Sequence, residues 1–149
     1  MGLPYERACT GDRALAEIEK LLRGFGCNKV GNWMDYDVMT LTIQFEYRGQ
    51  PVQVKASAKG YAAAYLREHP YDHARMRKSK SQHDKAALDQ GMVAMYSILR
   101  DWIKGQIMAV ETGILTFEGA FLGQLLLPSG LTVLEHAQQQ KLLPLKESA

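Results

Sequence analysis

The sequence predicts an α+β fold: an antiparallel β-hairpin or small sheet packed by helices, and a helical C-terminal half with one long amphipathic helix. Residues 38–47 alternate between apolar and polar side chains, which is typical of a strand with one buried face. Residues 12–23 and about 82–112 repeat apolar side chains at helical spacing. These three segments together indicate helices that pack on one face of a sheet.

The composition favours one globular domain. The chain has 149 residues and no linker, so we expect a single domain over residues 1–149 with a loose tail at 143–149. No apolar run approaches the roughly 20 residues that a membrane helix needs, and the N-terminus lacks the pattern of a secretory signal. We therefore expect a cytoplasmic protein with no membrane partner. Cys9 and Cys27 lack metal-type spacing and are expected to be reduced thiols.

The N-terminal half is predicted to form a helix followed by two or three strands. Asp12 can cap the first helix and Gly24 can end it, and its buried stripe would contain Leu15, Ile18, Leu22 and Phe25. Residues 28–34 are a candidate third strand. The turn RGQP at 48–51 would join strand 38–47 to a strand at 52–57 in an antiparallel hairpin. The expected inward residues are Met39, Leu41, Ile43, Phe45, Tyr47, Val52, Val54 and Ala56.

Two further helices are predicted in the middle of the chain. Residues 60–68 are rich in alanine and are stopped by Pro70, and a basic connection follows at 71–81. The long helix at about 82–112 would begin at a capping box formed by Ser81 and Asp84 and would end at Thr112 and Gly113. Its expected inner stripe is Leu88, Met92, Met95, Leu99, Trp102, Gln106 and Val110, with Ser97 on the solvent side.

The C-terminal segment allows two interpretations. Thr116 can cap a short apolar helix near 117–126, and Pro128, Ser129 and Gly130 form a turn. Thr132 and Glu135 then form a good capping box for a last helix. A β-hairpin over residues 124–135 is the competing interpretation, and the sequence leaves the choice open.

Charge is concentrated in the middle of the chain. The formal net charge is only +2, but residues 48–85 hold nine lysines and arginines against three acids. Such a segment can bind phosphates, and Tyr61, Tyr65 and Tyr71 can stack on bases. The favoured interpretation is therefore a non-catalytic nucleic-acid-binding protein, for DNA or RNA, that needs no cofactor. The expected contact residues are Arg48, Lys55, Lys59, Arg75, Arg77, Lys78 and Lys80. A solvated loop is the simpler alternative.

A metal-dependent nuclease is a second alternative. Over residues 13–68 the order helix, hairpin, helix resembles nucleases of the PD-(D/E)xK type, in which carboxylates hold Mg²⁺ and a lysine steadies the attacking water. The resemblance implies a site made of Glu17, Asp35 or Asp37, Gln53 and Lys55. Gln53 stands where the family usually has an acid, so the favoured interpretation of Gln53 and Lys55 is the polar face of an amphipathic hairpin. No other metal site is expected, because Pro70 breaks the helical spacing of the nearby histidines His69 and His73.

A protein-binding role is the third alternative. The segment 100–128 contains many large apolar residues, some of which can form a partner or homo-oligomer interface instead of core: Trp102, Ile103, Ile107, Ile114, Phe117, Phe121 and Leu122. The partner would be a host defence or DNA-processing complex that the protein inhibits.

Two stretches, PVQVKASAKGYAAAYL and ILRDWIKGQIMAVETGILTFEGAFL, are similar to hypothetical proteins encoded by tailed phages and prophages. The similarity covers residues 12–135. It implies expression in the cytoplasm of a bacterial host and a role in phage DNA metabolism or in blocking host defence. It implies no specific activity and no functional residues.

Overall fold

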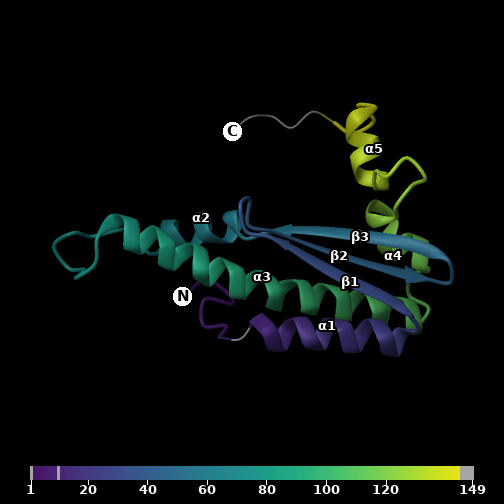
Figure 1. Cartoon of the computed structure of the whole chain (residues 1–149), viewed down its shortest axis with the longest axis horizontal. Helices are drawn as coiled ribbons and strands as arrows, with labels where there is room; N and C mark the ends of the chain where they lie inside the picture. Colours follow the sequence, from purple (N-terminus) through teal and green to yellow (C-terminus); the bar gives the residue numbers. More distant parts are fainter. Residues whose placement is uncertain (1, 10, 145–149) are drawn as a thin grey trace.

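The computed structural model describes residues 2–9 and 11–144, which form an α+β fold around a three-stranded antiparallel sheet. Helix α1 (Gly11–Phe25) leads into strands β1 (Lys29–Asp35), β2 (Thr40–Tyr47) and β3 (Gln50–Ser57), which lie in the sheet in that order. Helix α2 (Lys59–Glu68) and the long helix α3 (Lys80–Glu111) follow. The chain ends with α4 (Phe117–Phe121), the 3₁₀ turn η1 (Leu122–Gln124) and α5 (Val133–Gln139), as Figure 1 shows.

The strand register explains the two faces of the sheet. Ile43 of β2 pairs with Asn32 of β1 and Val54 of β3, and the alternate residues of all three strands lie on the opposite face. The inner face carries Leu41, Ile43, Phe45, Val52 and Val54, which are all buried. Both predicted hairpin strands are confirmed, and the candidate third strand is β1. Val38 and Met39 belong to the β1–β2 turn and not to the strand, because Asp35 Oδ1 accepts hydrogen bonds from the N–H groups of Asp37 and Val38.

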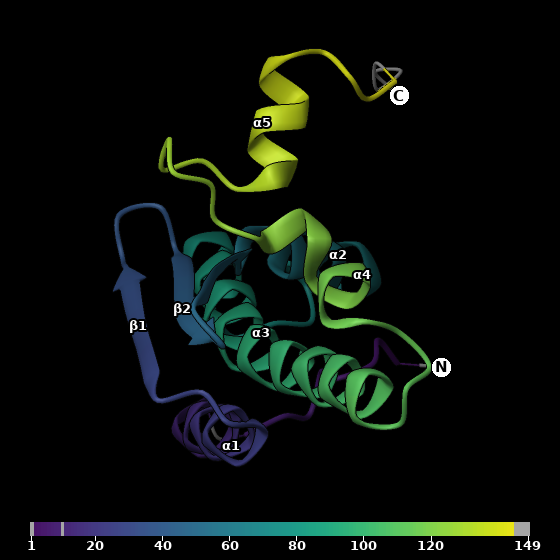
Figure 2. The same ribbon diagram turned by 90° about the vertical axis from the view of Figure 1, so that its right-hand side faces the viewer.

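The core lies between the inner face of the sheet and the helices α1 and α3. Ile18 and Leu22 of α1 and Leu99 and Ile103 of α3 join the buried strand residues in one cluster. Figure 2 shows α3 along one face of the sheet and α1 below it, while none of the described helices covers the other face. None of the helices in the described residues is long and apolar enough to cross a bilayer.

Helix α3 differs from the sequence expectation at its start and in its buried stripe. Its N-cap is Ser79, whose hydroxyl accepts from the Gln82 N–H while Gln82 Oε1 accepts from the Ser79 N–H, so the Ser81–Asp84 box is wrong. In the C-terminal half of α3 the most buried residues are Ile103 and Ile107, and Trp102 is half-buried beside them. Because α1, α2, α4 and the sheet all pack on this helix, it buries a wider face than one stripe, and Ser97 is buried too.

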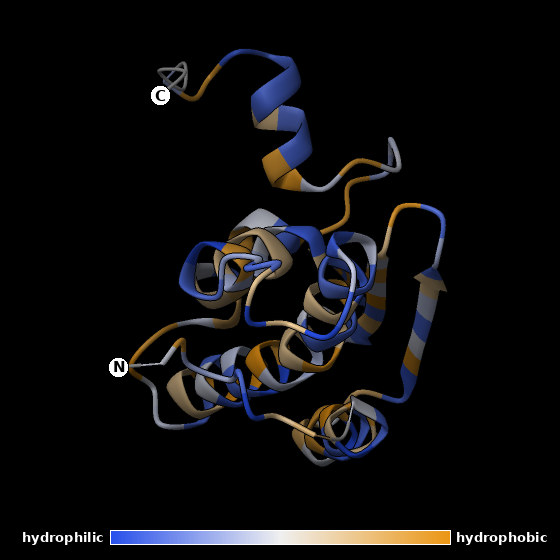
Figure 3. Cartoon of the chain, turned by 90° about the vertical axis from the view of Figure 1, so that its left-hand side faces the viewer, coloured by the Kyte–Doolittle hydropathy of each residue, from blue (hydrophilic) through white to orange (hydrophobic). Residues whose placement is uncertain are grey.

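The C-terminal elements combine the two interpretations of residues 124–135. Leu125 bridges Val52 at the β3 edge, Leu126 bridges Thr132, and the predicted Thr132–Glu135 capping box then begins α5. The helix predicted at 117–126 is shorter in the structure: it consists of α4 followed by the 3₁₀ turn η1, which ends at Gln124. Helix α5 has no buried residue and projects beyond the rest of the described chain, with a mostly hydrophilic surface (Figure 3). The predicted tail at 143–149 lies largely outside the described residues.

Candidate nucleic-acid interface

The basic residues predicted to form one surface lie at two ends of the molecule. Arg48 is in the β2–β3 turn, where its guanidinium stands 5.2 Å from the ring centroid of Tyr47. The α2–α3 loop, residues 69–79, lies at the opposite end of the long axis (Figure 1). Lys55 and Lys59 lie between these ends, on β3 and at the start of α2. Arg48 therefore does not extend the surface that carries Arg75, Arg77, Lys78 and Lys80.

The backbone of the α2–α3 loop is held by several hydrogen bonds. The carbonyl of Asp72 accepts from the N–H groups of Arg75 and Met76, and its Oδ1 accepts from the Ala74 N–H at 3.0 Å. The Tyr71 hydroxyl donates to the Lys78 carbonyl at 2.9 Å, which ties the two sides of the loop together. A loop backbone fixed in this way loses less conformational entropy when the loop binds a ligand.

Two of the four basic side chains at this loop have no acidic partner among the described residues. Arg75 Nε lies 3.5 Å from Asp72 Oδ2, and Lys80 Nζ lies 3.2 Å from Asp84 Oδ2. Arg77 is exposed and Lys78 is half-buried, and neither is in an ion pair within residues 2–9 and 11–144. These two cations are the ones most available to a phosphate.

The three tyrosines expected to stack on bases are already engaged. The Tyr61 hydroxyl donates to the Pro4 carbonyl at 2.6 Å, and the Tyr65 ring packs on His69 with centroids 4.6 Å apart. Tyr71 is held by Lys78, and its ring lies 5.9 Å from that of His83. Each of the three tyrosines therefore already has a contact within the fold, and stacking of these rings on bases stays a prediction.

Two aromatic residues that the sequence argument missed lie on or beside the outer face of the sheet. Trp33 on β1 is 73% exposed, and Tyr36 in the following turn is 72% exposed. Trp33 pairs with Thr42, and Thr42 pairs with Lys55, so these three residues form one cross-strand row. The sequence did contain a sign of this: in the candidate strand 28–34, Lys29, Gly31 and Trp33 alternate onto one face, which places a large aromatic ring on the polar side of the sheet.

A hollow of about 570 Å³ lies on this outer face. Its lining includes Trp33, Thr42, Gln44, Gln53 and Lys55, together with Gly130 from the turn before α5. Gln44 Nε2 donates to Gln53 Oε1 at 2.5 Å. The polar groups around the indole ring are therefore mainly side-chain amides, with the Thr42 hydroxyl and the Lys55 ammonium.

Lys55 is bridged to the last helix. Its ammonium lies 3.2 Å from Glu135 Oε2, and Glu135 Oε1 accepts from the Thr132 N–H at 3.0 Å. The hydrogen bond from Thr132 and then that from Lys55 hold the pKa of Glu135 below its ordinary value. Glu135 is consequently ionised near neutral pH and neutralises Lys55.

The residues of the nuclease alternative are not assembled into one site. Gln53 and Lys55 lie on the outer face on β3, and Asp35 lies on the same face but on β1, with β2 between them. Glu17 is on α1, below the other face, where it binds Arg13 and Arg100. No group of three or more His, Cys, Asp or Glu side chains in the described residues is placed to hold a metal ion.

The histidines beside the basic loop serve packing. His83 is buried in the first turns of α3, where its Nε2 lies 2.6 Å from the His69 carbonyl oxygen. His69 Nε2 lies 2.9 Å from Glu6 Oε2, and this pair joins the N-terminal segment to the end of α2. His73 Nδ1 lies 3.2 Å from the Tyr71 hydroxyl. The histidines thus help to hold the ends of the loop.

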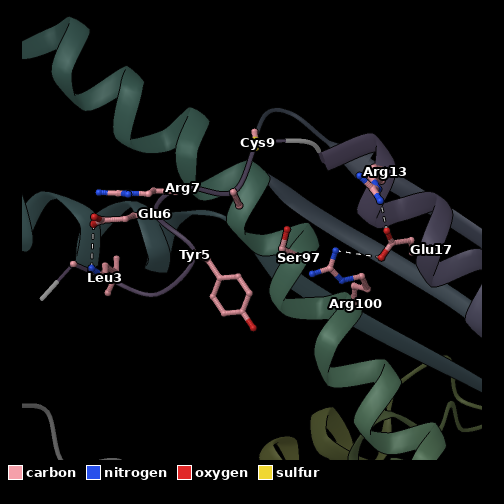
Figure 4. A pocket seen from close by; sticks show the side chains of 11 residues that line it. Leu3, Tyr5, Glu6, Arg7, Cys9, Arg13, Glu17, Ser97 and Arg100 are labelled. Carbon is pink, nitrogen blue, oxygen red and sulfur yellow. Dashed lines mark hydrogen bonds and ion pairs between the residues drawn. The ribbon is translucent and has the colours of Figure 1, made fainter.

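The N-terminal segment, residues 2–9, forms a cavity of about 630 Å³ with α1 and α3 (Figure 4). Glu17 binds Arg13 at 3.3 Å and Arg100 at 3.2 Å, and Arg100 Nε lies 3.1 Å from Asp101 Oδ1. The Tyr5 hydroxyl donates to Asp101 Oδ2 at 2.5 Å. The two acids in this chain of contacts offset its two arginines, so the network fixes the N-terminal segment and offers little net charge to a ligand.

The chain matches no protein-family model, no curated protein and no solved structure at a significant level.

Proposed function

We propose that this protein is a non-catalytic accessory protein of phage type that binds nucleic acid through the α2–α3 loop. The observation that carries the proposal is the pair of cations, Arg77 and Lys78, on a hydrogen-bonded loop at one extremity of the molecule, flanked by Arg75 and Lys80. A phosphate backbone can approach such a projecting loop without meeting the rest of the chain.

The charge of the loop supports phosphate as the ligand. Residues 73–80 contain four basic side chains and no acid, and the two acids that pair with them, Asp72 and Asp84, lie outside this run. Exposed ion pairs of this kind are weak and exchange readily for another anion. Arg75 and Lys80 can therefore turn from their acids to phosphates when a strand binds.

A salt titration tests the proposal. About four phosphate contacts predict a slope of about −3 for the logarithm of the binding constant against the logarithm of salt concentration on a single strand. The measurement is fluorescence anisotropy of labelled single-stranded DNA, duplex DNA and RNA at several salt concentrations. Binding that is absent, or that does not change with salt, would reject the proposal.

The same samples test the nuclease alternative. Incubation with plasmid DNA and Mg²⁺ or Mn²⁺ is expected to leave the DNA intact, because Glu17 and Asp35 are not gathered around Lys55. Cleavage that is lost in the Lys55→Ala variant would favour the nuclease instead.

A second candidate function is protein binding at the C-terminal end of α3. Of the apolar residues expected there, Ile103, Ile107, Phe117 and Phe121 are buried core. The exposed large apolar side chains around the α3–α4 turn are Met108, Ile114, Leu115 and Leu122. Ile114 is the most exposed of the four, at 74%. Co-purification of a host protein that is lost in Ile114→Asp, without any nucleic-acid affinity, would favour this function.

A further inference from the structure

The geometry points to a base-stacking site on the outer face of the sheet: Trp33 stacks on an unpaired nucleobase, while the α2–α3 loop holds the phosphates of the same strand. This inference rests on the proposed function, and it specifies single-stranded nucleic acid as the ligand.

Trp33 is the first support for a stacking site. Its indole is 73% exposed in the row that contains Thr42 and Lys55, on a face whose other strand residues are polar apart from Gly31 and Pro51. A second exposed ring, Tyr36, follows three residues later in the β1–β2 turn. Aromatic rings on an open surface are what sequence-tolerant binding of single strands uses, because each base has a face on which a ring can stack.

The amide pair beside Trp33 is the second support. Gln44 and Gln53 face each other in the neighbouring cross-strand row, and the hydrogen bond between them uses one donor of Gln44 and the acceptor of Gln53. The Gln44 oxygen and the Gln53 amino group remain for a ligand. An acceptor and a donor beside an aromatic ring match the edge of a nucleobase that is stacked on that ring.

Lys55 completes the site at the opposite side of the sheet. It lies two strands from Trp33, about 10 Å across the row. Its partner Glu135 comes from α5, whose first residue, Val133, packs against the core. A phosphate can replace the Glu135 carboxylate at Lys55, and the strand then crosses the sheet from β3 toward β1.

The charges on this face distinguish its role from that of the loop. Lys29 lies 3.6 Å from Glu46, Lys55 lies 3.2 Å from Glu135, and Asp35 is on the same face, so the face carries no excess of positive charge. Stacking on Trp33 therefore adds affinity that depends little on salt, while the α2–α3 loop and Lys55 supply the salt-dependent part. A duplex gains little here, because its bases are already stacked on one another.

Intrinsic fluorescence tests the inference. The chain has two tryptophans, and Trp102 is half-buried against Phe121 with ring centroids 5.8 Å apart. A short oligothymidylate is expected to quench the fluorescence of the wild type, and duplex DNA of the same length is not. The quenching is expected to be absent in Trp33→Phe, in which Trp102 is the one remaining tryptophan. It is expected to be retained in Trp102→Phe, in which Trp33 remains.

Anisotropy with labelled oligothymidylate provides the second readout. Trp33→Ala is expected to bind about tenfold or more weakly than wild type with the same salt slope, since one stacked base contributes this much. Trp33 is exposed, so the variant is expected to fold, and circular dichroism checks this. Binding without quenching, with full affinity in Trp33→Ala, would overturn the stacking site and leave the proposed function standing. Absence of any binding would overturn both.

Discussion

Gly91 of α3 lies directly against the carbonyl oxygen of Ala58, the residue that joins β3 to α2. A Cβ atom added at Gly91 would lie 2.6 Å from that oxygen and 3.2 Å from the Ala62 nitrogen. The N–H of Ala58 also donates to the Met39 carbonyl at 3.0 Å. The position of α2, and of the basic loop that follows it, therefore depends on the absence of a side chain at Gly91.

Gly91→Ala is expected to destabilise the protein by about 1–3 kcal/mol, because the contact is with backbone that cannot move aside easily. Gly105→Ala on the same helix is the matched control. A Cβ there would meet nothing within 4 Å, so alanine is expected to stabilise by up to about 1 kcal/mol through its helix propensity. Urea denaturation measures both, and a stabilising Gly91→Ala would show that the two helices are not packed this closely.

The two thiols are expected to differ sharply in reactivity. Cys9 is exposed, whereas Cys27 is 1% exposed and burial raises its pKa to about 11. Because the thiolate is the reactive form, a thiol reagent at pH 8 should modify one residue quickly and the second only after denaturation. Cys9→Ser should remove the fast phase, and Cys27→Ser should retain it. Rapid modification of both cysteines in the native wild type would contradict the buried position of Cys27.

The N-terminal segment is expected to be sensitive to acid. The hydrogen bond from Tyr5, and then that from Arg100, hold the pKa of Asp101 below its ordinary value of 3.8. A carboxyl with a lowered folded-state pKa stabilises the fold above its unfolded pKa, and this contribution disappears as pH falls through the folded value. Asp101→Asn should therefore be less stable than wild type at pH 7 but nearly equal to it once Asp101 is protonated.

Urea denaturation of wild type and Asp101→Asn at pH 7 and at a pH low enough to protonate Asp101 in the folded state measures this difference. Asp89→Asn, which changes an exposed carboxylate on the same helix, is the control. An Asp101→Asn deficit that is equally large at both pH values would show that the Tyr5–Asp101 contact is not the source of the stability.

Glu135→Gln is expected to raise the affinity for single strands several-fold, because the glutamine no longer neutralises Lys55. Glutamine can still accept from the Thr132 N–H at this capping-box position, so α5 should remain folded. Anisotropy with labelled oligothymidylate measures the change, and Glu118→Gln, with the same change in net charge on α4, is the control. Equal gains in both variants would mean that only net charge matters and that Lys55 does not contact the strand.

The strands and the main helices could be predicted because local patterns determine them. The alternation from Leu41 to Phe45 and the stripe of Ile18 and Leu22 depend only on which side of an element faces the core. The Thr132–Glu135 capping box likewise identified the start of α5, because both of its hydrogen bonds join residues three positions apart.

The candidate site was less predictable because it depends on contacts between distant segments. Charge density along the chain suggested that Arg48 and Arg77 share a surface, but the strand direction places the β2–β3 turn far from the α2–α3 loop. The engagement of Tyr61 by Pro4 and the pairing of Lys55 with Glu135 join residues 57 and 80 positions apart. Such pairings follow from how the helices pack, which no local pattern encodes.

Charge reversal in the α2–α3 loop tests the central claim most directly. The variant Arg75→Glu/Arg77→Glu/Lys78→Glu is compared with Lys20→Glu/Arg23→Glu/Arg48→Glu, which changes net charge equally at the other end of the molecule. Single-strand affinity is measured by anisotropy over a range of salt concentrations, with circular dichroism as the check on folding. Nucleic-acid binding through the loop predicts that the first variant loses binding while the second retains most of it with the wild-type salt slope. Equal losses in the two folded variants, or no loss in the first, would contradict it.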